Sequence, residues 1–219
     1  MTYSPPSAVR PLFLAAACLA LAACGATLRD ADRPLHVQDR FFAALASHCD
    51  KAYAGRLVSG DAADAAMQGR RMVMHVRECS DTRIAVPFHI QQADGEWDRS
   101  RTWLITRTAD MDGAGLRLKH DHRHADGSHD AVTMYGGDTA ADGTASAQDF
   151  PVDAESVALF RANDLTASVT NVWRVEVAPA GTEDAEFAYQ LSRADRLFRV
   201  EFDLTRPVPP PPAPWGWEQ

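Results

Sequence analysis

The chain has 219 residues, of which 22 are Lys or Arg and 30 are Asp or Glu, so its formal net charge at pH 7 is -8. Apolar residues make up 46% and charged residues 24%, which fits one ordinary globular domain and excludes a disordered or collagen-like chain. The acidic balance argues against nucleic acid as a partner, because binding to a polyphosphate requires a concentrated basic face.

Residues 1–23 are predicted to be an export signal. Arg10 supplies a short positive region, and the uninterrupted apolar run over residues 11–23 is too short to span a bilayer comfortably. The run ends in Leu21-Ala22-Ala23-Cys24-Gly25, which resembles the lipobox of bacterial lipoproteins. The resemblance implies that Cys24 is acylated and becomes the first residue of the mature chain. Because residue 25 is not Asp, it also implies the periplasmic side of the outer membrane. An ordinary signal peptide followed by a chance cysteine is the alternative.

The division of the remaining chain follows from composition. Residues 24–33 are short and polar and are predicted to be a tether. Residues 34–206 carry the regular hydrophobic patterns of one folded domain, whereas residues 207–219 are rich in proline and form a separate tail.

The cysteines predict a disulfide. Cys18 would leave with the signal and Cys24 would carry lipid, which leaves Cys49 and Cys79 in an oxidising compartment. A bond between them would close a loop of about 30 residues and stabilise the fold by about 3–4 kcal/mol on chain-entropy grounds. If Cys79 lies on a strand, this bond would fasten the first helix to the sheet. Two free buried thiols are the alternative.

Helical patterns come first along the folded domain. Pro34 suits the first position of a helix, apolar residues recur on one face over residues 37–52, and Gly55 is suited to end the helix. A second, short helix is predicted to begin after the capping residue Asp61 and to end at Gly69.

From residue 71 onward, apolar and polar residues alternate with the period of two that is typical of β-strands. Strands are predicted at residues 71–78, 83–91, 101–108, 116–123 and 130–135. A short helix capped by Asp153 follows, with Val157 and Phe160 facing inward, and three more strands are predicted at residues 171–177, 186–191 and 197–204. Dipeptides suited to tight hairpin turns punctuate the region, namely Asp94-Gly95, Asp112-Gly113, Asp126-Gly127 and Asp142-Gly143.

About eight or nine strands in one open sheet would leave long unpaired edges, whereas closure into a barrel removes them. We therefore expect a mainly β protein, an antiparallel up-and-down β-barrel with an N-terminal helix against one end and short helical inserts. The order of elements is similar to that of lipocalin-like and fatty-acid-binding-type barrels. The similarity is one of layout only and transfers no ligand residue. A β-sandwich is the alternative fold.

The tail has six prolines between residues 207 and 214, followed by Trp215-Gly216-Trp217. Such a run cannot join a central strand and prefers the polyproline II conformation. We expect a surface strap whose tryptophans pack on the barrel. An exposed segment that binds a protein partner is the sharper alternative, and a frayed tail is a third.

Histidines are concentrated in one short segment. On a strand, His120, His122 and His124 share a face with the leucines that precede them, so they point into the barrel if the leucines do. Imidazoles two residues apart can jointly bind a metal such as zinc, with His124 or His129 as the third ligand. A buried hydrogen-bonding or ligand-contact role and an exposed strand in an ion-pair network are the alternatives.

Arg101 and Trp103 share a predicted strand face with Arg99, next to the histidine strand. A pocket lined by arginine and histidine suits a small anionic ligand such as a carboxylate. The alternative is charge pairing with the plentiful carboxylates, which applies equally to the cations of the next strand, Arg117, Lys119 and Arg123.

Two further motifs are not expected to carry chemistry. Ser128-His129-Asp130 has the residue types of a hydrolase triad, but neighbouring residues of an extended segment point in opposite directions and cannot form the relay. Gly136-Gly137-Asp138 is predicted to be a turn, since a phosphate loop would need a following helix and a lysine.

Three functional hypotheses follow. The first is a tethered, non-catalytic module that binds a small ligand or a partner and needs no cofactor. The second is a metal-binding protein or metal-dependent enzyme that uses His120, His122 and His124. The third is a purely structural scaffold lipoprotein that works through its Pro/Trp tail.

Overall fold

A computed structural model describes residues 1–2, 35–108 and 115–217 of the chain. The chain divides into two compact units, Met1–Leu35 and His36–Gln219. Residues 3–23 of the predicted export signal, Cys24, the tether and Asp112-Gly113 lie outside the described residues. Within the described ranges, no helix has the length and apolar character that a membrane span requires.

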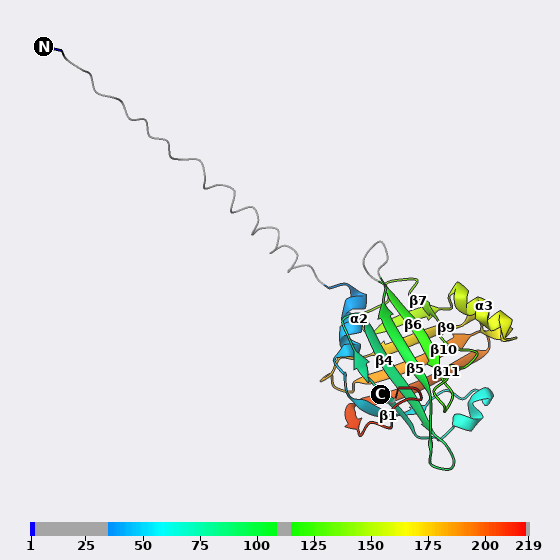
Figure 1. Ribbon diagram of the computed structural model, residues 1–219. Coiled ribbons are helices and arrows are strands. Elements are labelled where there is room, and N and C mark those ends of the chain that lie inside the picture. The colour runs from blue at the N-terminus through cyan, green and yellow to red at the C-terminus, as the bar shows by residue number, and fades with distance from the viewer. Residues whose placement is uncertain (3–34, 109–114, 218–219) are drawn as a thin grey trace. The chain divides into compact units, whose positions relative to one another are not determined.

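The unit His36–Gln219 is a mainly β structure in which antiparallel strands curl into a nearly closed barrel (Figure 1). Over the described residues the sheet has 11 strands in the order β7-β6-β5-β4-β2-β1-β11-β10-β9-β8, with β3 paired to β4 beside this path. The predicted barrel is thereby confirmed.

The strands are β1 (Ala52–Leu57), β2 (Met72–His75), β3 (Glu78–Cys79), β4 (Arg83–Gln91), β5 (Trp97–Arg107), β6 (Leu116–His122), β7 (Tyr135–Asp138), β8 (Ala147–Pro151), β9 (Val172–Val177), β10 (Glu186–Arg193) and β11 (Arg196–Val208). The helices are α2 (Val37–Ala46) and α3 (Ala154–Ala162), with short 3-10 turns η1 (Ala62–Met67) and η2 (Thr166–Thr170). The predicted caps Asp61 and Asp153 both accept backbone hydrogen bonds at the starts of η1 and α3.

The first helix is shorter than predicted. It ends at Ala46, and the residues from Ala52 onward form β1, which pairs with both β2 and β11. Gly55 does not end a helix. It lies in β1 at a close approach to β11, where an added Cβ would sit 2.3 Å from the ring of Phe202. The helical periodicity of residues 37–52 therefore continued by coincidence across a turn and into a strand.

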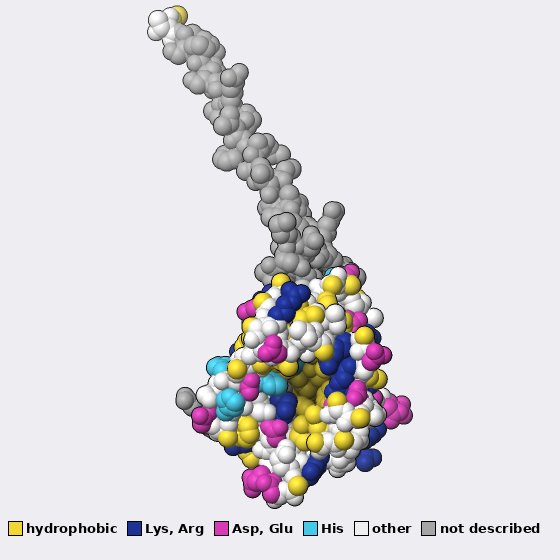
Figure 2. Space-filling view, turned by 90° about the vertical axis from the view of Figure 1, so that its right-hand side faces the viewer, with side chains coloured by type: hydrophobic (Ala, Val, Ile, Leu, Met, Phe, Trp, Pro, Cys, Tyr) yellow, Lys and Arg dark blue, Asp and Glu magenta, His cyan; other side chains and the backbone are white. Residues whose placement is uncertain are grey.

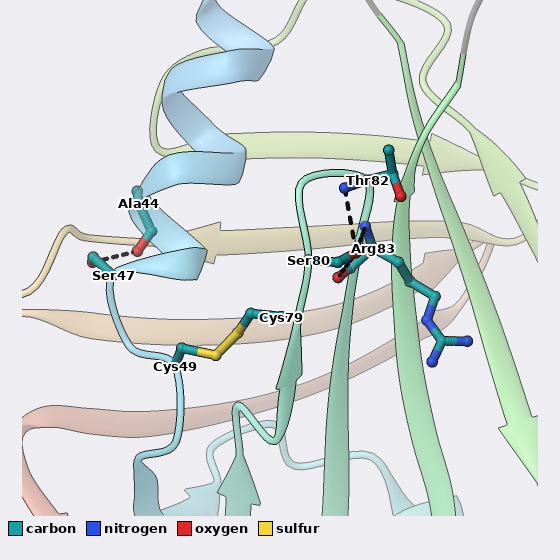
Figure 3. Close-up of a disulfide and its surroundings, with 7 residues drawn as sticks. All are labelled: Ala44, Ser47, Cys49, Cys79, Ser80, Thr82 and Arg83. Carbon is teal, nitrogen blue, oxygen red and sulfur yellow. Dashed lines mark hydrogen bonds between the residues drawn. A yellow bond between two sulfur atoms is a disulfide. The ribbon is translucent and has the colours of Figure 1, made fainter.

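Helix α2 covers one end of the barrel with Phe41, Phe42 and Leu45, which are buried. The predicted disulfide between Cys49 and Cys79 is confirmed, with their Cα atoms 6.2 Å apart. Figure 3 shows it joining the turn after α2 to β3. The helix is thus fastened to the sheet both by packing and by a covalent bond.

Strands β7 and β8 lie at the two ends of the strand order, and their backbones meet where the barrel nearly closes. The amide of Asp153 donates to the carbonyl of Gly136 (3.0 Å), and the amide of Gly136 donates to Ser156 Oγ (2.8 Å). A Cβ on Gly137 would lie 1.8 Å from the carbonyl oxygen of Pro151, so only glycine fits. The predicted turn at residues 136–138 is therefore wrong, because these glycines belong to a strand, and the strand predicted at residues 130–135 begins only at Tyr135.

Residues 209–217, called the strap from here on, cross the outside of the barrel. Val208 still pairs with Ala52 of β1, whereas the amide of Trp215 donates to the carbonyl of Arg99 on β5 (3.1 Å). Because β2 and β4 lie between β1 and β5, the strap must pass over both strands. Trp217 Nε1 then donates to Asp121 Oδ2 on β6 (3.1 Å). The predicted surface strap is confirmed from residue 209 onward. The expectation that the proline run joins no central strand is wrong for its first two residues, because Pro207 and Val208 extend β11 and pair with β1. Strand β4 is buried on both of its faces.

Candidate ligand-binding cavity

A cavity of about 200 Å³ opens into the barrel at the end away from α2. Its apolar lining comes from Met67, Phe88, Trp103, Tyr135, Tyr189, Leu191 and Phe198, and its polar lining from Asp64, Arg101, His120, His122 and Arg196. The space-filling view shows a hollow with a hydrophobic floor and with histidine and basic side chains around it, in keeping with this lining (Figure 2). The four residues predicted to contact a ligand, Arg101, Trp103, His120 and His122, all line this inner cavity.

The aromatic side of the inner cavity is a row of stacked rings. Trp103 lies between Phe88 and Tyr189, with ring centroids 4.9 and 4.3 Å away and planes nearly parallel. Stacked rings in fixed rotamers form a rigid, apolar surface. Trp103 itself is almost fully buried, so it contributes mainly by holding its neighbours in place.

His120 is buried and uses both of its ring nitrogens. Nδ1 lies 3.0 Å from the carbonyl oxygen of Tyr135, which can only accept, so Nδ1 carries the proton. Nε2 therefore accepts a hydrogen bond from the hydroxyl of Tyr189 (2.7 Å). Desolvation lowers the pKa of His120 to about 3, with a smaller effect from His122, so the ring stays neutral. The buried hydrogen-bonding role considered for this residue is the one observed.

His122 lies nearer the opening of the inner cavity. Its Nε2 is 3.1 Å from the hydroxyl of Tyr135, and its Nδ1 has no hydrogen-bond partner among the described residues. Desolvation and the charge of Arg101 lower the pKa of His122 to about 4. Burial raises the pKa of Tyr135 to about 12. At neutral pH both groups are uncharged, and each can donate or accept a hydrogen bond.

A β-bulge decides which side chains of β5 face inward. Phe88 of β4 lies opposite Arg101, but Ile90 lies opposite Asp98, so one residue of β4 faces Arg99 and Ser100 together. The alternation of β5 is thereby shifted. Arg99 points to the strap, where its Nη1 donates to the carbonyl of Ala213 (2.6 Å). The expectation that Arg99 shares a face with Arg101 and Trp103 is therefore wrong.

The same bulge places a carboxylate beside Arg101. Nη1 of Arg101 donates to Asp98 Oδ2 (2.5 Å) and to Ser100 Oγ (3.0 Å). Nε and Nη2 of Arg101 have no hydrogen-bond partner among the described residues. The guanidinium is thus held in place from one edge and keeps its other donors available.

A second ion pair stands on the wall that η1 and the β10–β11 hairpin form. Arg196 donates two hydrogen bonds of 2.6 Å to the carboxylate of Asp64, and it lies 3.1 Å from Asp61 Oδ2. Asp64 is only 1% exposed. Both of these acids lie at or in η1, so the pair fastens this short segment to the hairpin beside the inner cavity.

The four histidines considered as zinc ligands are not brought together. Strand β6 ends at His122, so the alternation does not extend to His124, which is exposed and pairs loosely with Asp130 (3.8 Å). His129 lies instead near Asp121 (3.3 Å). Among the described residues no group of three or more His, Cys, Asp or Glu side chains could hold a metal ion.

The remaining cations of β6 and its hairpin are paired with carboxylates, as one alternative expected. Lys119 contacts Asp153 and Glu155 at 2.9 and 3.0 Å. The pairs Arg117–Asp138 and Arg123–Asp121 are 2.6 and 2.9 Å long. These charges fasten α3, β7 and the hairpin to β6 and are not aimed into the inner cavity.

Several lining residues were not singled out in the sequence. Tyr189 and Phe198 could have been found from the inward phase of their strands. Tyr135 could not, because its strand was placed too early. Asp64 and Arg196 are far apart in the chain, and no local pattern indicates that they meet.

Comparison with known proteins adds no family to this description. No family model matches the chain, and no curated protein matches it. The class of protein is therefore the one that fold and site define: an antiparallel β-barrel with an aromatic cavity bordered by arginine and histidine.

Proposed function

We propose that the protein is an exported lipoprotein, anchored through Cys24 on the periplasmic side of the outer membrane, whose barrel binds a small amphiphilic anion without chemical conversion. The single observation that carries the binding role is Arg101 with its free donors beside the stacked aromatic rings of the inner cavity. The lipobox resemblance at Leu21-Ala22-Ala23-Cys24 supports the anchoring.

The apolar part of the ligand would lie against Phe88, Tyr189 and Phe198. Removal of apolar surface from water yields about 25 cal/mol per Å², so even a short alkyl chain gains affinity there. The inner cavity of about 200 Å³ is smaller than the usual drug-sized site, which favours a short chain or a single ring.

The anionic part would lie at Arg101. Nε and Nη2 can form a paired hydrogen bond with a carboxylate, and the free Nδ1 of His122 lies on the same cavity wall. Both ring nitrogens of His120 form hydrogen bonds, with Tyr135 and Tyr189. His120 therefore shapes the cavity and is not placed to exchange protons with a ligand. This supports binding over catalysis.

Calorimetry with octanoate and octanol tests the proposal, using the full chain in lipid nanodiscs and empty nanodiscs as the blank. Octanoate is expected to bind about tenfold more tightly than octanol, because a charge-assisted hydrogen bond contributes about 1.5 kcal/mol to the binding free energy. Arg101→Gln should remove this difference and leave octanol binding unchanged.

The matched control is Arg56→Gln, which removes an arginine whose side chain is 76% exposed and lies outside the inner cavity. It should bind both probes as the unaltered protein does. Failure of both probes to bind, or equal affinity for the two, would overturn the proposed function.

A further inference from the structure

The inner cavity is not the only hollow at this end of the barrel. An outer basin of about 500 Å³ is lined in part by Arg101 and His122, the same side chains that border the inner cavity. The two hollows therefore meet at these residues. Among the other side chains of the outer basin are Gln92, Trp97, Ser100, Arg123, His124 and Trp215.

Trp215 reaches the outer basin because the strap is firmly seated beside it. Its amide donates to the carbonyl of Arg99, and Arg99 in turn donates to the carbonyl of Ala213. The next residue, Gly216, has a φ of +77°, and an added Cβ would lie 2.7 Å from Arg123 Nη1 and 2.9 Å from the carbonyl oxygen of Gly127. Only a glycine permits this approach, so the backbone conformation at residue 216 fixes where Trp215 lies.

The chemistry of the outer basin differs from that of the inner cavity. It offers two indole rings, Trp97 and Trp215, each partly exposed. Between them lie hydrogen-bonding side chains of every kind: amide and hydroxyl groups, carboxylates such as Asp98 and Asp130, and cations such as Arg123. Because the outer basin contains charges of both signs, it does not favour a strongly charged ligand.

A hydroxylated ring suits such a lining. Each hydroxyl group both donates and accepts, so it can satisfy neighbouring amides, carboxylates and guanidinium groups at once. The C–H faces of a sugar are apolar and can pack on an indole ring, as ligand sites commonly combine aromatic surfaces with a few placed polar groups.

We propose that the outer basin binds a sugar or polyol head group of the same ligand whose apolar part enters the inner cavity, and that the docked strap completes this site through Trp215. The inference rests on the proposed function and narrows the ligand class from amphiphilic anions in general to those that also carry a hydroxylated head. It gives the Pro/Trp tail a role inside the ligand site instead of a free partner-binding role.

Octyl glucoside and octanol form the matched pair of probes, since they differ only in the sugar. With the full chain in nanodiscs, octyl glucoside is expected to bind at least about fivefold more tightly, the equivalent of one net hydrogen bond. Trp215→Ala should reduce the affinity for octyl glucoside to that for octanol, while octanoate binding stays unchanged. Trp215→Phe, which keeps an aromatic face, should retain most of the gain.

Trp217→Ala is the control within the strap, because Trp217 contacts Asp121 and does not line the outer basin. Slow hydrogen exchange at the amide of residue 215 would show in each variant that the strap is still docked. Equal binding of octyl glucoside and octanol to the unaltered protein, or full octyl glucoside affinity in Trp215→Ala, would overturn the inference. If octyl glucoside binds the unaltered protein but octanoate does not, the result would instead count against the proposed function of the inner cavity.

Discussion

Among the described residues, His89 is the one with two buried side-chain atoms that lack a hydrogen-bond partner. It is 1% exposed on the outward face of β4, and neither ring nitrogen has a hydrogen-bond partner among the described residues. The strap crosses this strand, and its prolines have no N–H group to donate. Charged and titratable groups near the ring include Asp98 and Arg99 from β5, His75 from β2, and Arg77.

Protonation of His89 is therefore unfavourable in the folded state. Desolvation, followed by repulsion from Arg99, lowers the pKa of His89 from 6.5 to about 4. In the unfolded chain the ring takes up a proton below about pH 6.5, whereas in the folded chain it does so only near pH 4. The unfolded state thus binds more protons in this window, and stability falls as the pH falls through it.

Between pH 7 and pH 4.5 the unaltered protein loses stability as His89 resists protonation. We predict that the His89→Leu variant loses about 2–3 kcal/mol less over the same range. At pH 7 the variant should be as stable as the unaltered protein or more so, because two unpaired buried polar atoms are replaced by an apolar group. Urea unfolding at both pH values measures the effect. His124→Leu, which removes an exposed imidazole, should retain the full acid-dependent loss, and an equal loss in both variants would refute this account.

At the scale of elements, alternation and capping residues predicted most of the barrel. Strands β4, β6 and β9 to β11 were placed within a few residues, and Asp153 correctly marked the start of α3. Strand β7 was placed too early because Gly136-Gly137 is typical of a turn, and the actual role of Gly137 depends on the backbone of Pro151, 14 residues further along the chain. A contact between residues this far apart in the chain produces no local pattern in the sequence. Strand β8 was not predicted.

The candidate site was only partly predictable for a similar reason. Alternation placed Arg101 on one strand face with Trp103, and His120 and His122 on the face of the preceding leucines. All four side chains line the inner cavity. The bulge at Arg99 and Ser100 reverses the phase of β5 and cannot be seen in its residue types. Ion pairs between distant segments were equally invisible, because they depend on closure of the barrel.

Among these pairs, Asp64–Arg196 holds η1 in place. Replacing Asp64 by Asn keeps the shape of the side chain but removes the negative charge that accepts two short hydrogen bonds from Arg196. We predict a loss of about 2 kcal/mol in the free energy of unfolding, because two charge-assisted hydrogen bonds are weakened while Asp61 still pairs with Arg196. Chemical denaturation measures it.

Glu78→Gln provides the comparison for that loss. It removes a carboxylate that accepts one hydrogen bond of 2.9 Å from Arg83, in a pair whose side chains are both 45% exposed. Solvent screening limits such a pair to less than about 1 kcal/mol. Similar losses in the two variants would show that burial does not set the strength of the Asp64 pair.

At the scale of the whole molecule, the two ends of the barrel have different roles. Helix α2 and the disulfide close one end, and the described chain enters the barrel unit there, at His36. The inner cavity and the outer basin open at the other end.

Acylation of Cys24 can be tested by substitution, with Cys18 as the control cysteine. Cys24→Ala should abolish acylation, so that the protein loses the mass of the attached lipid and leaves the outer-membrane fraction. Cys18→Ala changes a cysteine inside the predicted signal and should leave acylation and fractionation unchanged. Mass spectrometry of the mature N-terminal peptide and membrane fractionation measure both. If Cys24→Ala remains in the membrane and its N-terminal peptide differs in mass only by the replaced side chain, the Leu21-Ala22-Ala23-Cys24 motif is a chance likeness, because a processed lipoprotein must carry its acyl groups on that cysteine.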